Sequence, residues 1–331
     1  MMLKIGIIGA NGFLGLELIR ILKAHPKVVI SKILQRDSNI EHEFSHLKNL
    51  GLDKLQTDNL DDFKNLDCVF LSLPHGSAEE YVKKLIDHVK IIDLSADFRI
   101  ADQENYFKYY KSNFNSDLQK KFQYGFIEKN YSSIKNTNYI ANPGCFALTA
   151  QLSILSFEDI INQISITAIT GSSGGGKAPT LKNHHSIRSK DLFSYNINNH
   201  RHLSEIYQSF PSLESSLSFI PLSGSFSRGI YLTAHISTNT EVNEKILMDR
   251  LQSNFKDMPF IRIQDQIKLS NVVGSNYCDI SISFQNDHHF VVEACLDNLV
   301  KGASGNAVEC MNLMYGLDQD MGLNNLIPTF L

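Results

Sequence analysis

One cysteine of this chain lies where a thiol could act as a nucleophile. Cys145 follows a Pro-Gly turn in ANPGCFALTAQL, and the alanine- and leucine-rich run after it predicts a helix. A thiol at a helix N-terminus lies at the positive end of the helix dipole, which favours the reactive thiolate. By contrast, Cys68, Cys295 and Cys310 lie within apolar patterns that are typical of buried thiols.

A cysteine nucleophile needs an acid-base partner, and the segment NHRHLSE supplies candidates. It holds two imidazoles, His200 and His202, and a carboxylate, Glu205, that could orient either ring. No further cysteine or histidine lies at zinc-like spacing nearby, so we expect no metal.

A glycine-rich turn near the N-terminus is typical of dinucleotide binding. A strand-like run precedes GANGFLG and a helical pattern follows it, so backbone N–H groups and a helix dipole could hold a pyrophosphate there. We expect the whole turn to contact the cofactor, that is Gly9, Ala10, Asn11, Gly12, Phe13, Leu14 and Gly15. A tight turn without a ligand is the alternative. Arg36 follows the second strand-like run, where a guanidinium suits the 2'-phosphate of NADPH unless it is a solvated surface charge.

Three further polar segments are candidates for binding anions or cofactor. Arg99 in IDLSADFR lies just past a strand end, where ligands of α/β proteins bind, although an ion pair with Asp97 or Asp93 explains it equally well. The loop GSSGGGK would let the backbone approach a flat ring or a phosphate. A basic and imidazole cluster, either a cationic rim at the site or a solvated loop, comprises Lys182, His184, His185, Arg188 and Lys190.

The elements that must position these residues follow two patterns. Short apolar runs at 3–8, 28–34, 68–73, 89–95 and 138–142 alternate with helical stretches, which predicts an α/β domain with a Rossmann-type doubly wound parallel sheet. After residue 150, longer strand-like runs predict an α+β domain with a mixed sheet. Because the helix near 303–315 could return to the first domain, we expect an NADP-binding domain at 1–145 and 303–331 and a catalytic and dimerisation domain at 146–302.

Composition narrows the class of protein. The 31 basic and 35 acidic side chains leave a formal charge of -4, so there is no general cationic surface for nucleic acid or anionic lipid. The five cysteines form no CxxC pair, and we find neither a signal-peptide pattern nor a membrane-length apolar run. These features predict a soluble, cytoplasmic protein that acts on small molecules.

Taken together, the motifs resemble one enzyme family over nearly the whole chain. GANGFLG, SLPHG, IDLSADFR, NPGC, GSSGGGK, NHRHLSEI, RGIYLTAH and KGASGNAVECMN occur in the order seen in N-acetyl-gamma-glutamyl-phosphate reductases, of the aspartate-semialdehyde dehydrogenase-like superfamily. HHSIRS, FIRI, GSNYCDI and MGLNNLIP are similar to the branch whose substrates are attached to the acidic amino-group carrier protein LysW, in lysine and sometimes arginine biosynthesis.

The resemblance implies a phosphorylating, NADPH-dependent aldehyde dehydrogenase. Cys145 would form a thioester with a glutamyl or aminoadipyl acyl phosphate, His200 rather than His202 would be the acid and base, and Glu205 would orient it. The cofactor residues that it implies are Pro74, His75, Ser173, Gly174 and Asn306, and the phosphate or substrate residues are Asn142, Arg99, Arg228 and Arg188. It also implies a homo-oligomer, a dimer or a tetramer.

Three other functions stay open. The first is a reductase that acts on free N-acetyl-gamma-glutamyl phosphate, and the second is an aspartate-semialdehyde dehydrogenase, which the HRHLSE motif disfavours. The third is a dinucleotide-binding regulator without turnover, which the placement of Cys145 in NPGC disfavours.

Overall fold

The chain folds into two compact units. The computed structural model describes residues 2–35, 40–111, 115–181 and 184–328. One unit comprises Met1–Ala101, Ser112–Asn142 and Ala303–Asn325, and the other comprises Asp102–Lys111, Pro143–Gly302 and Leu326–Leu331. Residues 102–111, which the sequence pattern places in the first domain, belong to the second unit by their contacts.

The first unit is built on a six-stranded parallel sheet with the strand order β2-β1-β3-β4-β6-β5. Every ladder in it is parallel, which confirms the doubly wound α/β prediction. Parallel strands are buried on both faces, and accordingly Ile5, Ile7 and Ile8 are fully buried. The strands are β1 (Leu3–Ile8), β2 (Val28–Leu34), β3 (Cys68–Leu71), β4 (Lys90–Asp93), β5 (Gln123–Tyr124) and β6 (Tyr139–Ala141).

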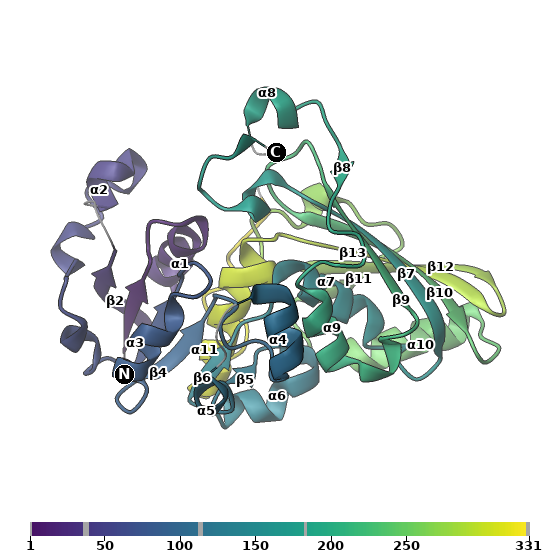
Figure 1. Cartoon of the computed structure of the whole chain (residues 1–331), viewed down its shortest axis with the longest axis horizontal. Helices are drawn as coiled ribbons and strands as arrows, with labels where there is room; N and C mark the ends of the chain where they lie inside the picture. Colours follow the sequence, from purple (N-terminus) through teal and green to yellow (C-terminus); the bar gives the residue numbers. More distant parts are fainter. Residues whose placement is uncertain (1, 36–39, 112–114, 182–183, 329–331) are drawn as a thin grey trace. The chain divides into compact units, whose positions relative to one another are not determined.

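Helices cover this sheet, and the last of them comes from the end of the chain (Figure 1). They are α1 (Phe13–Ala24), α2 (Ile40–Glu43), α3 (Ala78–Leu85), α5 (Ser116–Gln119), α6 (Ile127–Lys135) and α11 (Gly305–Met314). All ten residues of α11 are buried, and the helix packs against α1 and α6. An entirely buried helix belongs to the core, so α11 is part of the core of this unit and not a surface helix.

The second unit is built on a seven-stranded mixed sheet with the order β11-β12-β13-β10-β7-β9-β8. The β7–β10, β10–β13, β12–β13 and β8–β9 ladders are antiparallel, while β7–β9 and β11–β12 are parallel. The strands are β7 (Ile161–Thr170), β8 (Phe193–Ser194), β9 (Leu217–Ser223), β10 (Ile230–Thr238), β11 (Ile261–Ile263), β12 (Cys278–Asn286) and β13 (His289–Leu296). This mixed sheet confirms the predicted α+β architecture.

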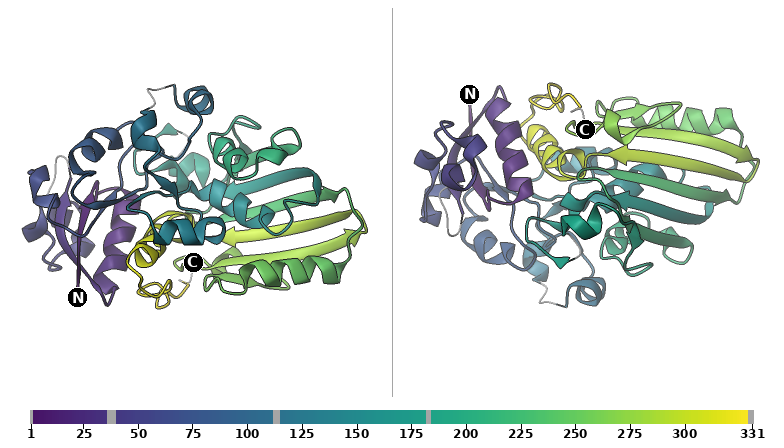
Figure 2. Two further views of the ribbon diagram at one scale, coloured as in Figure 1. Left: turned by 90° about the horizontal axis from the view of Figure 1, so that it is seen from below. Right: turned by 90° about the horizontal axis from the view of Figure 1, so that it is seen from above.

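In the described part of the chain, helices pack on one face of this sheet. The helices of the unit are α4 (Gln103–Tyr110), α7 (Cys145–Ile154), α8 (His185–Arg188), α9 (Leu203–Ser209) and α10 (Glu244–Phe255). α7 packs on β10 and β13, α10 packs on β11 and β12, and Phe146 of α7 contacts Phe219 of β9. In the right-hand view of Figure 2, which is seen from above, the strands lie in front of α7 and α10. Along β10 the buried positions alternate with half-buried or exposed ones such as Thr233 and His235, as expected for a sheet with one uncovered face.

Candidate active site

Cys145 is the first residue of α7, as the sequence predicts. Gly144, in extended conformation, is the N-cap, and the nine residues that follow Cys145 in α7 are buried. The other four cysteines are buried, whereas Cys145 is partly exposed. Burial raises the pKa of Cys68 and raises that of Cys295 to about 12, so these two thiols stay protonated and unreactive.

Glu205 and His202 lie directly behind the turn that carries Cys145. The backbone N–H of Gly144 donates to Glu205 Oε2 at 2.8 Å, and Glu205 Oε1 lies 3.9 Å from His202 Nε2. The His202 ring lies so close to Gly144 that a Cβ atom at position 144 would be 2.4 Å from Nε2. The first turn of α9 therefore joins a fully buried carboxylate and an imidazole to the turn that presents the thiol.

His200 is buried as a neutral imidazole. Burial, assisted by the Arg201 charge, lowers its pKa to about 4. Its Nδ1 accepts a hydrogen bond from the backbone N–H of His202 at 3.2 Å, which assigns the proton of the neutral ring to Nε2. The ring packs edge-on against Phe146 and lies 4.7 Å from the His202 ring, centroid to centroid. His200 Nε2 is thus set to donate a hydrogen bond at neutral pH.

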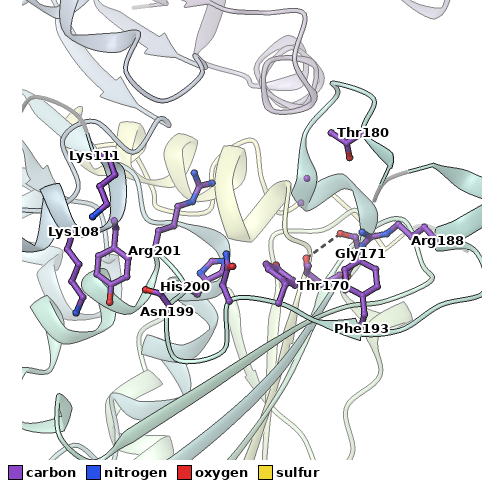
Figure 3. Close-up of a pocket in the computed structure, with 16 residues that line it drawn as sticks. Lys108, Lys111, Thr170, Gly171, Thr180, Arg188, Phe193, Asn199, His200 and Arg201 are labelled. Atoms are coloured by element: carbon purple, nitrogen blue, oxygen red, sulfur yellow. Dashed lines mark hydrogen bonds between the residues drawn. The ribbon is translucent and has the colours of Figure 1, made fainter.

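A cationic pocket of about 630 Å³ opens beside His200 within the second unit (Figure 3). In Figure 3, Lys108, Lys111 and Arg201 lie on one side of His200, and Arg188 lies on the other. No acidic side chain is among the 16 residues that line the pocket. The lining residues are Lys108, Tyr109, Lys111, Thr170, Gly171, Gly174, Gly175, Thr180, Arg188, Phe193, Tyr195, Asn196, Asn199, His200, Arg201 and Ser223. This charge balance suits a small polyanion.

Three of these cations could not be recognised as pocket residues from the sequence. Lys108 and Lys111 lie in and just after α4, a segment with no motif, which reaches the pocket only because it belongs to the second unit. Arg201 lies between the two histidines in the sequence, and this position was the only indication that it could belong to the site. Arg188, predicted for a surface rim, is buried and donates to the Thr170 carbonyl at 3.2 Å.

Three other predicted residues of the second unit lie on paired loops. Ser173 Oγ donates to Asn298 Oδ1 at 3.3 Å, and Gly174 lines the pocket. Arg228 forms an ion pair with Asp297 at 3.0 Å. The neighbouring backbone groups are joined as well, since Ser173 N–H donates to the Ser227 carbonyl at 3.0 Å.

The glycine turn of the first unit has the geometry that a pyrophosphate needs. Gly9 has φ +85°, and a Cβ there would lie 2.3 Å from the Ser72 carbonyl oxygen. A Cβ at Gly15 would lie 2.5 Å from the Ala10 carbonyl oxygen, so Gly15 lets α1 approach the turn closely. Only one distant atom would meet a Cβ at Gly12, the N-cap, and no side chain caps α1 there. These residues fit a dinucleotide held at the N-terminus of α1.

Asp97 fixes the loop that carries Pro74 and His75. It accepts hydrogen bonds from the backbone N–H groups of Gly76 at 2.6 Å and Ala78 at 2.8 Å, and lies 2.7 Å from His75 Nδ1. The loop that follows β3 and opens α3 is therefore held in one conformation by a buried carboxylate.

Asn306, Asn142 and Arg99 lie buried in the first unit. Asn306 Nδ2 donates to Asn142 Oδ1 and to the Gly125 carbonyl, each at 2.9 Å, while its Oδ1 is buried and meets no donor among the described residues. A buried acceptor of this kind fits a ligand amide such as that of nicotinamide. Arg99 donates to the Leu94 carbonyl at 2.9 Å. Arg36 and Lys182 lie outside the described residues.

Two classes of site are not found in the described part of the chain. No group of three or more histidine, cysteine, aspartate or glutamate side chains there could hold a metal ion. Likewise, none of the helices that the structure describes has the length and apolar character needed to cross a membrane.

Comparison with known proteins agrees with this geometry. Residues 4–137 match the family model "Semialdehyde dehydrogenase, NAD binding domain", and residues 145–298 match "Semialdehyde dehydrogenase, dimerisation domain". The fold is similar to the crystal structure of aspartate semialdehyde dehydrogenase II from Vibrio cholerae, with a TM-score of 0.71 and 13% identity over 96% of this chain and 99% of that one.

Curated relatives are similar over their full length. The N-acetyl-gamma-glutamyl-phosphate reductase of Archaeoglobus fulgidus is 36% identical over 329 residues, which is 97% of this chain and 98% of the relative. That of Karelsulcia muelleri is 37% identical over 335 residues, with the same coverage. The chain therefore belongs to the N-acetyl-gamma-glutamyl-phosphate reductase family within the semialdehyde dehydrogenase superfamily.

Proposed function

We propose that this enzyme reduces free N-acetyl-gamma-glutamyl phosphate to the semialdehyde, with NADPH as reductant and release of inorganic phosphate. The observation that carries the proposal is the full-length similarity to reductases of that name, together with a partly exposed thiol and a pocket lined by four cations in one unit. The reductase class to which the chain belongs uses NADP.

The chemistry assigned to the chain is covalent. The Cys145 thiolate attacks the acyl carbon, the tetrahedral adduct expels phosphate, and the acyl group stays on sulfur as a thioester. When bound, NADPH supplies the hydride that reduces this thioester to a thiohemiacetal. Loss of the thiohemiacetal proton then breaks the C–S bond, which releases the aldehyde and returns the thiolate.

The geometry favours His202 over His200 as the base for Cys145, the reverse of the order expected from the sequence. His202 lies against Gly144 with Glu205 behind it, so a proton taken from the thiol would be stabilised by a buried carboxylate. His200 carries its proton on Nε2 and suits hydrogen-bond donation to the substrate carbonyl or phosphate.

The cationic pocket supports an anionic substrate of the size of an acylated glutamyl phosphate. Such a substrate carries a phosphate and a carboxylate, and the lining offers Arg188 on one side and Lys108, Lys111 and Arg201 on the other. Ion pairs and charge-assisted hydrogen bonds to both ends would orient the acyl carbon.

A carrier-linked substrate has less support than a free one. That prediction needed a cationic rim, and Arg188 is instead buried against the Thr170 carbonyl, which removes one member of the rim. His184, His185 and Lys190 are exposed. The curated relatives compared here are named for an acetylated substrate.

We also propose that the enzyme forms a homodimer through the uncovered face of the second unit's sheet. Thr233 lies at the centre of that face, paired in register with Thr167 on β7 and Glu293 on β13. A second copy placed on this face would bury its half-exposed side chains, and the matching family model is described as a dimerisation domain.

The test is an assay of the purified enzyme with NADPH and three substrates: free N-acetyl-gamma-glutamyl phosphate, its carrier-linked counterpart and aspartyl phosphate. We expect efficient reduction of the first. Faster reduction of the carrier-linked compound would favour the LysW branch, and turnover of aspartyl phosphate alone would overturn the assignment.

A further inference from the structure

A buried carboxylate at the end of β13 holds four partners that the catalytic chemistry does not use. Asp297 is fully buried. Its Oδ1 accepts from the backbone N–H groups of Leu299 at 2.8 Å and Val300 at 3.2 Å, and its Oδ2 accepts from Gly274 N–H at 2.6 Å. Arg228 Nη2 lies 3.0 Å from Oδ2 and 3.2 Å from Oδ1. A single carboxylate thus joins three backbone segments.

The segment that follows Asp297 reaches Cys145 directly. The backbone N–H of Gly302 donates to the Asp297 carbonyl at 2.9 Å. A Cβ atom at Gly302 would lie 2.9 Å from Cys145 Cβ, so the backbone of the π-helix Val300–Ser304 lies against the nucleophile. The Asp297 side chain thus holds the start of the segment whose backbone lies against Cys145.

The next residue acts on the glycine loop that lines the pocket. Asn298 Oδ1 accepts from Gly229 N–H at 2.6 Å, and its Nδ2 donates to Ser173 Oγ at 3.0 Å. Asn298 is 2% exposed, so this amide is part of the core. It links the loop of Ser173 to the loop of Arg228 on the pocket side of the sheet.

We propose that Asp297 and Asn298 are positioning residues, of which Asp297 sets the backbone against Cys145 and Asn298 sets the glycine loop. Neither touches a reacting atom, and both act through groups that they hold. The activity assays rest on the proposed function, whereas alkylation of Cys145 by iodoacetamide depends on no substrate.

Asp279 supplies a matched control. It is 1% exposed and pairs with Arg262 at 2.6 Å, just as Asp297 pairs with Arg228, and its partner is exposed to a similar extent. Replacing either aspartate by asparagine leaves a partly exposed arginine without its carboxylate and removes one buried negative charge. Only at position 297, however, can the new NH2 group face the backbone N–H donors of Leu299 and Val300, in the segment that touches Cys145.

The experiment compares Asp297→Asn, Asn298→Ala and Asp279→Asn by urea unfolding, steady-state kinetics and the pH dependence of Cys145 alkylation. In Asp297→Asn we expect kcat to fall on the order of 100-fold and the alkylation profile to change, because a misplacement of about 1 Å has that effect on catalysis. In Asn298→Ala we expect a KM for NADPH raised several-fold and unchanged alkylation. Asp279→Asn should lose stability but keep both kinetic constants.

Equal kinetic losses in Asp297→Asn and Asp279→Asn, scaled to their loss of stability, would show that Asp297 is merely structural. If Asp297→Asn does not fold, Gly302→Ala tests the same contact, because its Cβ presses on Cys145 while Asp297 is retained. Normal alkylation in Gly302→Ala would overturn the inference for Asp297. Failure of every substrate with normal alkylation in the wild-type enzyme would instead count against the proposed function.

Discussion

The reactivity that we propose for Cys145 depends on its surroundings rather than on its residue type. The four other thiols are buried, while Cys145 begins a helix, is partly exposed, and follows a glycine whose N–H is held by Glu205. The His202 ring lies against Gly144 and the backbone of Gly302 lies against Cys145, so Cys145 alone among the five thiols combines partial exposure with these neighbours.

One equivalent of iodoacetamide should therefore label the folded enzyme, at Cys145 only. Mass spectrometry after proteolysis checks the position. Cys145→Ala should show no label and no turnover in either direction, yet bind NADPH as the wild type does, since its Rossmann-type unit is unchanged. Turnover above a tenth of the wild-type rate in this variant would rule out the nucleophile assignment.

The two imidazoles should respond differently to replacement by asparagine. His202→Asn removes the proposed base and should lower kcat on the order of 10² to 10⁴-fold. His200→Asn keeps a donor near the substrate and should lose less. Single-turnover kinetics of acylation separate the two, and a larger loss in His200→Asn would restore the order expected from the sequence.

His200 should also make the fold sensitive to acid. Its pKa is about 4 in the folded state and about 6.5 when unfolded, so below pH 6.5 the unfolded chain binds a proton that the folded chain does not. Stability should fall on the order of 3 kcal/mol between pH 6.5 and pH 4 from this group alone. Urea unfolding of the wild type and of His200→Asn at both pH values checks this, and an equal loss in the variant would contradict it.

At the scale of elements, the start of α7 could be predicted from the sequence, whereas the unit to which α4 belongs could not. α7 was predicted because Pro, Gly and an apolar run mark its start locally. The assignment of α4 to the second unit has no local signal, since it depends on contacts with residues far along the chain. The hydrogen bonds of Asp297 could not be predicted from the sequence either. Two of its partners, Gly274 and Arg228, lie 23 and 69 residues away along the chain.

The cations of α4 should contribute to substrate binding. Lys108→Gln with Lys111→Asn removes two charges, and asparagine tolerates the left-handed conformation of Lys111, which has φ 51°. We expect KM for the acyl phosphate to rise about tenfold or more and KM for NADPH to stay constant, because a charged hydrogen bond contributes about 1.5–3 kcal/mol.

Lys83→Gln with Lys84→Gln on α3 is the control for net charge, since it removes two charges from the first unit. An equal rise in KM for the acyl phosphate in both double variants would mean that general electrostatics, and not the pocket, is responsible.

At the scale of the whole molecule, both sheets could be predicted from pattern alone. Short apolar runs that alternate with helical stretches predicted the parallel sheet, and the longer strand-like runs after residue 150 predicted the mixed sheet. The membership of residues 102–111 in the second unit could not be predicted in this way. No local feature of the sequence marks the point where the chain passes from one unit to the other.

The open face of the second sheet gives a prediction for the assembly. Thr233→Arg places a charge at the centre of the proposed dimer interface, facing its own copy across the symmetry axis. We expect a monomer by light scattering for this variant and a dimer for the wild type. An unchanged mass for the variant would show that copies associate elsewhere.

The division of the chain into two units also determines the order in which the units can fold during synthesis. The first unit begins at the N-terminus but includes α11, whose ten residues are all buried against α1 and α6. Domains generally fold as the ribosome releases them, N-terminal part first. The strands of the first unit are therefore synthesised first but complete their core only when α11 has been synthesised. The second unit, which lies mostly between them in the sequence, can fold before that. A truncated chain that ends at residue 304 should therefore keep a second unit that resists protease, whereas its first unit should be cleaved.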